Sequence, residues 1–183
     1  MRNGGAACTS ANRIFVQKGI AEEFLAAFTK AMDTFVMGRG TDEGVTLGAY
    51  VSLKERDKIA ELVDEAIKNG ASVRTGGKKP DGPGAFYPAT VMTVDKYNSI
   101  LKHEIFGPVA PIVIFDSDEE GIALANDTEF GLISYVFSGE LGRAIRTAEA
   151  MESGMVAINK GVISDPAAPF GGVKQSGLGR EGG

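Results

Sequence analysis

The sequence predicts an α/β fold with a largely parallel sheet flanked by helices. The main observation is an alternation along the chain. Short apolar runs that suit buried strands alternate with longer segments in which apolar residues recur at helical spacing. Crossovers between parallel strands are expected to be right-handed. There is no internal repeat and no linker, so the 183 residues indicate one domain.

The N-terminal part of the chain supplies two helices and three extended segments. Ser52 and Glu55 form a capping box for the second helix, and Asn69-Gly70 supplies its C-terminal stop. A turn with two prolines and two glycines covers residues 78–84. In chain order we expect a strand over 14–16, a helix over 20–36, a helix between Ser52 and Asn69, a strand over 72–75 and an extended segment over 87–94.

The C-terminal part continues the alternation and then loses it. Residues 109–115 form the clearest buried strand, and Ser117 with Glu120 forms a second capping box. In chain order we expect a helix to about residue 126, a strand over 133–138, a helix over 141–151, a strand over 155–158 and a glycine-rich loop over 159–183. In sheets of this kind, functional sites gather in loops beyond the strand ends. The loops over 1–10, 102–108 and 159–180 are therefore the ones to examine.

Composition excludes several classes of function. The net charge is −5, the pI is about 5.0, and the longest basic run is Lys78-Lys79, so neither nucleic acid nor a membrane surface is an expected partner. No apolar stretch approaches the roughly 18 residues of a membrane span, and the N-terminus is not a signal peptide, so a cytoplasmic setting is expected. One cysteine and one histidine make a metal site improbable, and no disulfide can form within the chain.

Cys8 is the only cysteine and lies in a segment with little side-chain bulk before it. Gly4 and Gly5 let the backbone fold closely around a group that approaches the sulfur of Cys8. If Thr9 or Ser10 caps a following helical turn, Cys8 lies near a helix N-terminus, which favours the thiolate that acts as a nucleophile. The alternative for a lone cysteine is an inert, buried small residue. From the residues alone, both interpretations stay open.

Three motifs resemble the aldehyde dehydrogenase family. Residues 103–108, His-Glu-Ile-Phe-Gly-Pro, resemble its Glu-x-Phe-Gly-Pro motif, and residues 126–132, Asn-Asp-Thr-Glu-Phe-Gly-Leu, resemble its Asn-x-x-x-x-Gly-Leu motif. Residues 169–177, Pro-Phe-Gly-Gly-Val-Lys-Gln-Ser-Gly, resemble its Pro-Phe-Gly-Gly-x-Lys-x-Ser-Gly motif. Their order and spacing after an Asn-x-Gly-x-x-Cys segment match over essentially the whole chain. The resemblance implies the catalytic domain of this family.

The resemblance implies a reaction and a cofactor. In the family, the cysteine attacks the aldehyde, hydride passes to NAD or NADP, and water hydrolyses the resulting thioester. Cys8 would be the nucleophile, and its backbone N–H would help to hold the oxyanion. Glu104 would hold the nicotinamide ribose, and Phe106 would pack beside the nicotinamide ring. The alternative for Glu104 is a solvated carboxylate, and the alternative for Phe106 is a core side chain. His103 is not expected to be catalytic.

The branch of the family that oxidises succinate semialdehyde to succinate is the most similar one. Its Phe-Arg-Asn-x-Gly-Gln-x-Cys and Ile-Ser segments resemble Arg2-Asn3 to Cys8 and Ile163-Ser164. The resemblance assigns the substrate carboxylate to Arg2 and Ser164, since an arginine can pair bidentately with a carboxylate. Phe170 is expected to line the substrate channel or to pack in the core. Lys174, Arg143 and Arg146 are expected to be solvated charges.

The resemblance also implies that residues 1–183 are a fragment, lacking a preceding coenzyme-binding domain and a C-terminal tail. We therefore expect no bound cofactor and no turnover for the chain alone, and a homo-oligomer for the full-length protein. The choice between NAD and NADP lies outside this sequence. Ala6 departs from the family, which has glutamine at that position. Two alternatives to a succinate-semialdehyde dehydrogenase stay open. One is a dehydrogenase for a different acidic semialdehyde, such as glutarate semialdehyde, and the other is a non-catalytic domain of the same fold.

Overall fold

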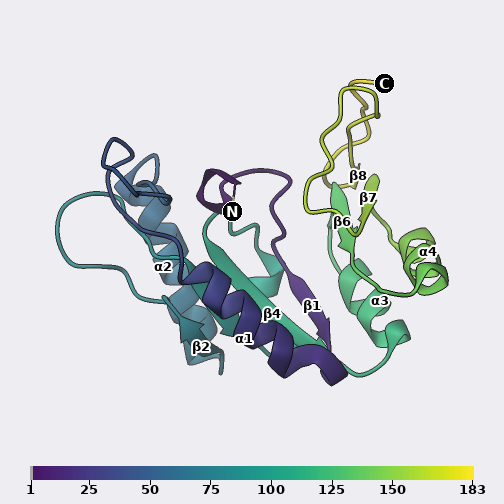
Figure 1. Ribbon diagram of the computed structural model, residues 1–183, viewed down its shortest axis with the longest axis horizontal. Helices are drawn as coiled ribbons and strands as arrows, with labels where there is room; N and C mark the ends of the chain where they lie inside the picture. The colour runs from purple at the N-terminus through teal and green to yellow at the C-terminus, as the bar shows by residue number, and fades with distance from the viewer. Residues whose placement is uncertain (1) are drawn as a thin grey trace. The chain divides into compact units, whose positions relative to one another are not determined.

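A computed structural model describes residues 2–183, and Met1, the first residue of the segment singled out above, lies outside the described residues. The chain divides into two compact units, Met1–Phe115 and Asp116–Gly183. Each unit has its own sheet and helices and is described by itself (Figure 1). Within residues 2–183, no helix is both long and apolar enough to span a bilayer.

The first unit contains a four-stranded sheet in the order β1-β4-β3-β2. The strands are β1 (Ile14–Gln17), β2 (Ser72–Thr75), β3 (Thr90–Thr93) and β4 (Val109–Phe115). β4 is parallel to both β1 and β3, with Ile14 opposite Ile112, whereas β2 is antiparallel to β3 at the sheet edge. The expectation of a largely parallel sheet is confirmed. β4 is the longest strand because its apolar residues are buried on both faces of the sheet.

The helices of the first unit are α1 (Ala21–Met32) and α2 (Leu53–Lys68), together with the short 3₁₀ segments η1 (Arg2–Gly5), η2 (Lys18–Ile20) and η3 (Ser99–Lys102). The capping box is confirmed, because Ser52 Oγ accepts a hydrogen bond from the Glu55 backbone N–H at 3.2 Å. α1 ends four residues earlier than predicted. The backbone N–H of Val36 donates to Thr46 Oγ1 instead of continuing the helix.

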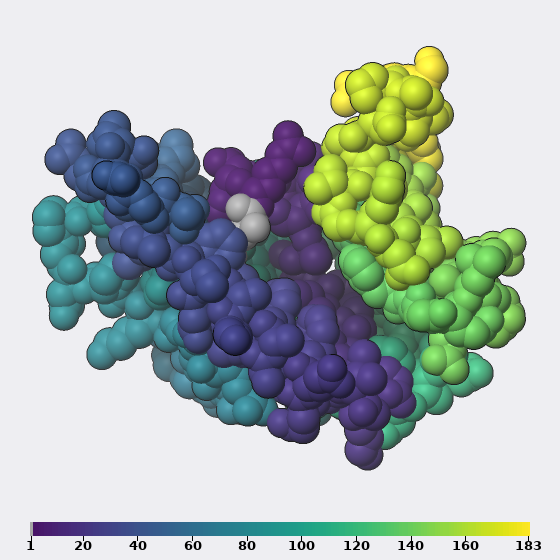
Figure 2. Space-filling view, viewed as in Figure 1, coloured from purple at the N-terminus to yellow at the C-terminus, as the bar shows by residue number. Residues whose placement is uncertain are grey.

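Helix α1 crosses the face of the sheet that is turned toward the viewer, and it forms a ridge in the space-filling view (Figures 1 and 2). Leu25 and Met32 of α1 pack with Val91 of β3 and Ile112 of β4 in one core cluster. Met92, the neighbour of Val91, points to the opposite face and is also fully buried. Both faces of the sheet are therefore covered, which leaves the strand-end loops as the places where polar side chains are accessible.

The second unit contains two short strand pairs and two helices. Its elements are α3 (Asp118–Asn126), β5 (Phe130–Gly131), β6 (Ile133–Val136), α4 (Leu141–Ala150), β7 (Met155–Ile158) and β8 (Val173–Lys174). β6 and β7 are parallel, and β5 and β8 are antiparallel. The predicted capping box is confirmed, because Ser117 Oγ accepts from the Glu120 backbone N–H at 3.2 Å. The expectation that residues 159–183 are loop throughout is wrong at β8.

Lys174 corrects a second expectation. Its Nζ donates to the backbone oxygens of Asn126 at 2.9 Å and Thr128 at 3.3 Å, and it lies 2.7 Å from a carboxylate oxygen of Glu152. Its side chain is only 26% exposed. Lys174 therefore joins β8 to the end of α3 through hydrogen bonds and an ion pair, and it is not a solvated charge.

Candidate active site

Cys8 lies in a tight turn and its side chain is exposed. The turn is closed by a hydrogen bond of 2.9 Å from the Ser10 N–H to the Ala7 oxygen, and the chain then leads directly into β1. The backbone N–H of Cys8 donates no hydrogen bond within residues 2–183. The buried alternative for Cys8 is excluded. The expectation that Cys8 lies at a helix N-terminus is wrong, because the polar residues after it enter a turn and then a strand.

Gly5 fixes the turn of Cys8 against the loop that carries Glu104. Gly5 is buried with φ of +81°, and a Cβ placed there would lie 2.1 Å from the backbone oxygen of Gly107. No side chain fits in that space, so both the left-handed backbone and the close approach require glycine. The two loops, more than 90 residues apart in sequence, are therefore in direct backbone contact.

The sequence interpretation missed Asn12, which joins the same two loops. Asn12 Nδ2 donates to the backbone oxygen of His103 at 2.6 Å, and Asn12 Oδ1 accepts from the backbone N–H of Ile105 at 2.7 Å. These two backbone groups flank Glu104. An asparagine between a cysteine turn and a strand carries no local pattern that predicts such long-range bonds, so only the structure reveals them.

Glu104 and Phe106 both point out of the fold. Glu104 is exposed and makes no ion pair or hydrogen bond within residues 2–183, whereas Ile105 between them is 2% exposed. Phe106 is 45% exposed and has φ of +56°, a left-handed conformation that is rare for a bulky residue and typical of functional sites. Phe106 is therefore not a core side chain. An acceptor carboxylate and a free aromatic face, two residues apart, fit a ribose diol and a flat ring of a nicotinamide nucleotide.

The Phe106–Gly107 backbone is supported from below by Tyr50. A Cβ at Gly107 would lie 1.9 Å from the Tyr50 hydroxyl, so the tyrosine occupies the space under the loop. Burial, and next the neighbouring Tyr87, raise the pKa of Tyr50 well above the ordinary value of 10.0. Neither hydroxyl has a hydrogen-bond partner within the part of the chain that the structure describes. Burial likewise raises the pKa of Tyr87, so both phenols keep their protons, Tyr50 directly beneath the loop.

Arg2 begins the same N-terminal segment and is exposed. Asn3, at φ of +48°, turns the backbone between Arg2 and the cysteine turn. Its Nδ2 donates to the Ala6 oxygen at 2.8 Å, and the Ala6 N–H donates to the Asn3 oxygen at 3.0 Å. The guanidinium of Arg2 makes no ion pair within residues 2–183. It is therefore an unpaired cation on the segment that carries the thiol.

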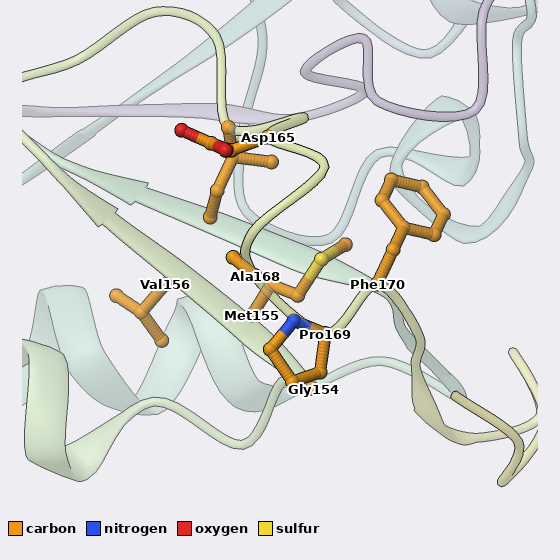
Figure 3. Close-up of a pocket in the computed structure, with 8 residues that line it drawn as sticks. Gly154, Met155, Val156, Asp165, Ala168, Pro169 and Phe170 are labelled. Carbon is orange, nitrogen blue, oxygen red and sulfur yellow. The ribbon is translucent and has the colours of Figure 1, made fainter. Parts of the chain in front are cut away.

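The remaining two predicted residues, Ser164 and Phe170, lie in the second unit, which contains a pocket of about 210 Å³. Phe170 lines it, as do Ile163 and Asp165, which lie on either side of Ser164 in the chain; Ser164 itself is exposed. Figure 3 shows Asp165 and Phe170 apart on the pocket wall, with Ala168 and Met155 lower in this view. Phe170 lines this pocket, and its place in a substrate channel stays a prediction.

Local bonds shape the pocket wall. The Ala167 N–H donates to Asp165 Oδ1 at 2.9 Å, and the Ala168 N–H donates to the Asp165 oxygen at 3.0 Å. Phe170 pairs with Glu181 through two backbone hydrogen bonds of 2.7 and 2.9 Å. The first unit thus brings the loops of Cys8 and Glu104 together, whereas Ser164 and Phe170 belong to a separate loop of the second unit.

Comparisons with known proteins agree with the fold. The model of the aldehyde dehydrogenase family matches residues 1–183. The chain therefore belongs to the aldehyde dehydrogenase family, whose members oxidise aldehydes, and the resemblance seen in the motifs is confirmed.

Two relatives and one solved structure show which members of the family this chain is similar to. The chain is 50% identical to the succinate-semialdehyde dehydrogenase of Paenarthrobacter nicotinovorans, over 100% of this chain and 41% of that protein. It is 45% identical to a glutarate-semialdehyde dehydrogenase of Pseudomonas putida, over 99% of this chain and 38% of that protein. A solved structure described as an E. coli NADP dependent enzyme superposes with a TM-score of 0.95 at 43% identity, covering 99% of this chain and 38% of that one. The chain thus spans about two fifths of each.

Proposed function

We propose that this chain is the catalytic part of an NAD- or NADP-dependent dehydrogenase that oxidises succinate semialdehyde to succinate, with Cys8 as nucleophile. The observation that carries the proposal is the turn of Cys8. It presents an exposed thiol on a loop that Gly5 and Asn12 fix against the loop of Glu104 and Phe106. A nucleophile and two groups suited to a nicotinamide nucleotide are thus held on one rigid support.

In the first step, the Cys8 thiolate forms a bond to the aldehyde carbon, and the carbonyl electron pair moves to oxygen to give a thiohemiacetal anion. The free backbone N–H of Cys8 is available to hydrogen-bond that oxygen. The turn therefore supplies both the nucleophile and an oxyanion donor.

In the second step, the oxygen lone pair re-forms the carbonyl as hydride leaves the carbon, and a thioester on Cys8 results. Oxidised NAD or NADP, when bound, accepts that hydride. Glu104 would accept hydrogen bonds from the ribose hydroxyls, and Phe106 would offer its exposed ring face. Water then attacks the thioester, which releases the carboxylic acid and returns the thiol.

The substrate class rests on the unpaired cation of Arg2 and on the relatives. A semialdehyde of a dicarboxylic acid carries a carboxylate at the end opposite its aldehyde, which suits a guanidinium on the same segment as the thiol. We assign carboxylate binding to Arg2 and Ser164, and we assign to Phe170 the lining of the substrate channel. Glutarate semialdehyde is the second candidate, because a relative of 45% identity bears that name.

We further propose that turnover needs a coenzyme-binding domain besides these residues and that the complete enzyme is a homo-oligomer. The relatives are more than twice as long as this chain, which leaves room for such a domain. We expect the 183-residue chain alone to show no aldehyde oxidation. A chimera in which it replaces the matching segment of the Paenarthrobacter relative should be active.

The test measures oxidation of succinate and glutarate semialdehydes, with NAD⁺ and with NADP⁺, by the chain alone and by the chimera. The proposal predicts activity in the chimera only and a higher kcat/KM for succinate semialdehyde. A preference for glutarate semialdehyde would support the second candidate. A folded but inactive chimera with an alkylation-resistant Cys8 would favour a non-catalytic domain and contradict the proposal.

A further inference from the structure

We propose that Asn12 is a positioning residue, which sets the place of Glu104 relative to Cys8 through two hydrogen bonds to the backbone on either side of Glu104. The inference rests on the proposed function, because it assigns Glu104 a ligand. It goes beyond that function in naming the side chain that joins the nucleophile turn to the cofactor-facing loop.

The geometry of the two bonds is the first argument. In an extended segment, the oxygen of the preceding residue and the N–H of the following residue point to the same edge. Asn12 occupies that edge of Glu104, donating to His103 at 2.6 Å and accepting from Ile105 at 2.7 Å. A side-chain amide supplies one donor and one acceptor, so it replaces a neighbouring strand at this single residue.

The lack of other support at Glu104 is the second argument. The carboxylate of Glu104 makes no bond within residues 2–183, and its side chain is exposed, so neither packing nor charge fixes it. The preceding segment η3 ends at Lys102, and the next strand begins only at Val109. The bonds of Asn12 and the buried side chain of Ile105 therefore hold this part of the loop.

The position of Asn12 in the chain is the third argument. It lies four residues after Cys8, beyond the turn that Ser10 closes, and two residues before β1 begins at Ile14. A shift of the Glu104 backbone would be transmitted to this turn, and the reverse also holds. Because hydride transfer needs the reacting atoms in a near-attack geometry, a small displacement between the two loops would lower the rate strongly.

The second unit supplies a matched control. Asn126 Nδ2 donates to the Ala150 oxygen at 2.8 Å, and Asn126 Oδ1 accepts from the Glu152 N–H at 2.9 Å. Asn126 thus holds Met151 with the same pair of bonds by which Asn12 holds Glu104, but no residue of the proposed site lies there. The variants N12A and N126A remove equivalent bonds, so their comparison separates positioning from general stability.

Amide hydrogen exchange of the 183-residue chain tests whether Asn12 holds the backbone on either side of Glu104. In N12A, the Ile105 amide should exchange about tenfold faster, since two hydrogen bonds are lost, while in N126A the Glu152 amide should do so and Ile105 should not. N12D keeps the acceptor for the Ile105 N–H and should restore most of its protection. Unchanged exchange at Ile105 in N12A would overturn the inference.

Kinetics of the chimera test the consequence. N12A should lower kcat and raise the KM for the nicotinamide cofactor, each about tenfold, with the KM for aldehyde little changed, and N126A should leave all three constants as they are. Equal changes in N12A and N126A would show a merely structural role and overturn the inference. If the unmutated chimera oxidises no aldehyde, the proposed function fails, and the exchange experiment still decides whether Asn12 holds the Glu104 backbone.

Discussion

The loops of Cys8 and Glu104 in the first unit and the loop of Ser164 and Phe170 in the second unit are built in opposite ways. In the first unit, Gly5 and Asn12 connect segments more than 90 residues apart through backbone contacts. In the second unit, Asp165 accepts most of the hydrogen bonds of residues 161–168 from its own neighbours Ala167 and Ala168, and Phe170 pairs with Glu181 only eleven residues on.

The difference separates two tasks. In the proposed function, a thiol and the groups that face a cofactor need a fixed mutual geometry, and the long-range contacts between their loops provide it. A pocket wall that selects among substrates of similar shape gains from a loop whose conformation depends on its own residues, because such a loop changes with little effect on the core.

Replacing the nucleophile should have the largest effect. In the chimera, Cys8→Ala should lower kcat for succinate semialdehyde by at least about 10⁴-fold, as for loss of other covalent nucleophiles. The thermal midpoint should not change, because the exposed Cys8 side chain makes no bond that the fold needs. Ser10→Ala, in the same turn, is the control for loop damage. Activity that survives in C8A would assign the chemistry to another residue.

Gly5→Ala should disrupt the contact between the Cys8 turn and the loop of Glu104 and so destabilise the first unit. The methyl group would lie 2.1 Å from the Gly107 oxygen at φ of +81°, so steric strain and a left-handed alanine together should cost about 3 kcal/mol of unfolding free energy. Gly44→Ala, at φ of +78° in open space, should cost only about 1 kcal/mol. Urea unfolding of both variants measures the difference, and equal losses would contradict the close contact.

Arg2→Gln should separate substrate charge from chemistry. In the chimera, kcat/KM for succinate semialdehyde should fall about tenfold to hundredfold because a charge-assisted pair is lost, whereas butanal, which lacks the carboxylate, should be affected little. Ser164→Ala, which removes one neutral donor of the second unit, should cost less than Arg2→Gln. An equal loss for both aldehydes would show that Arg2 shapes the turn instead of binding the carboxylate.

Alkaline pH should lower the free energy of unfolding of the first unit through its buried tyrosines. Near neutral pH this effect should be negligible, so it is the smallest of the expected effects. Burial raises the pKa of Tyr50 above the unfolded value near 10, so the folded state binds the phenol proton more tightly. The associated stability is present below pH 10 and is lost as the pH rises above that value. Tyr50→Phe should shift the onset of alkaline unfolding upward. An unchanged onset would place the alkaline transition at another group.

The sequence predicted the elements well where local signals and burial agreed. The capping boxes at Ser52 and Ser117 and the apolar run of β4 each specify a start or a core strand without help from distant residues. The end of α1 was missed because Val36 bonds to Thr46 across a loop. β8 was missed because two residues carry no periodicity, and its pairing with β5 depends on the fold.

The candidate site divides in the same way. The motifs pointed to Cys8, Glu104 and Phe106 because residue types and spacing in a family are visible in one chain. Asn12 has no such mark, since its partners are backbone groups of residues 103 and 105 that no residue identity predicts. The helix expected after Cys8 was wrong for a related reason: Thr9 and Ser10 suit a turn as well as a helix start, and the strand that follows decides between them.

Trapping of the covalent intermediate tests the account most directly. The chimera would be mixed with succinate semialdehyde and excess oxidised cofactor, quenched with acid within the first turnover, and digested for mass spectrometry. The account predicts a succinyl thioester on the peptide that contains Cys8, absent when cofactor is omitted. Turnover without any acyl group on Cys8, or an acyl group on another residue, would contradict it.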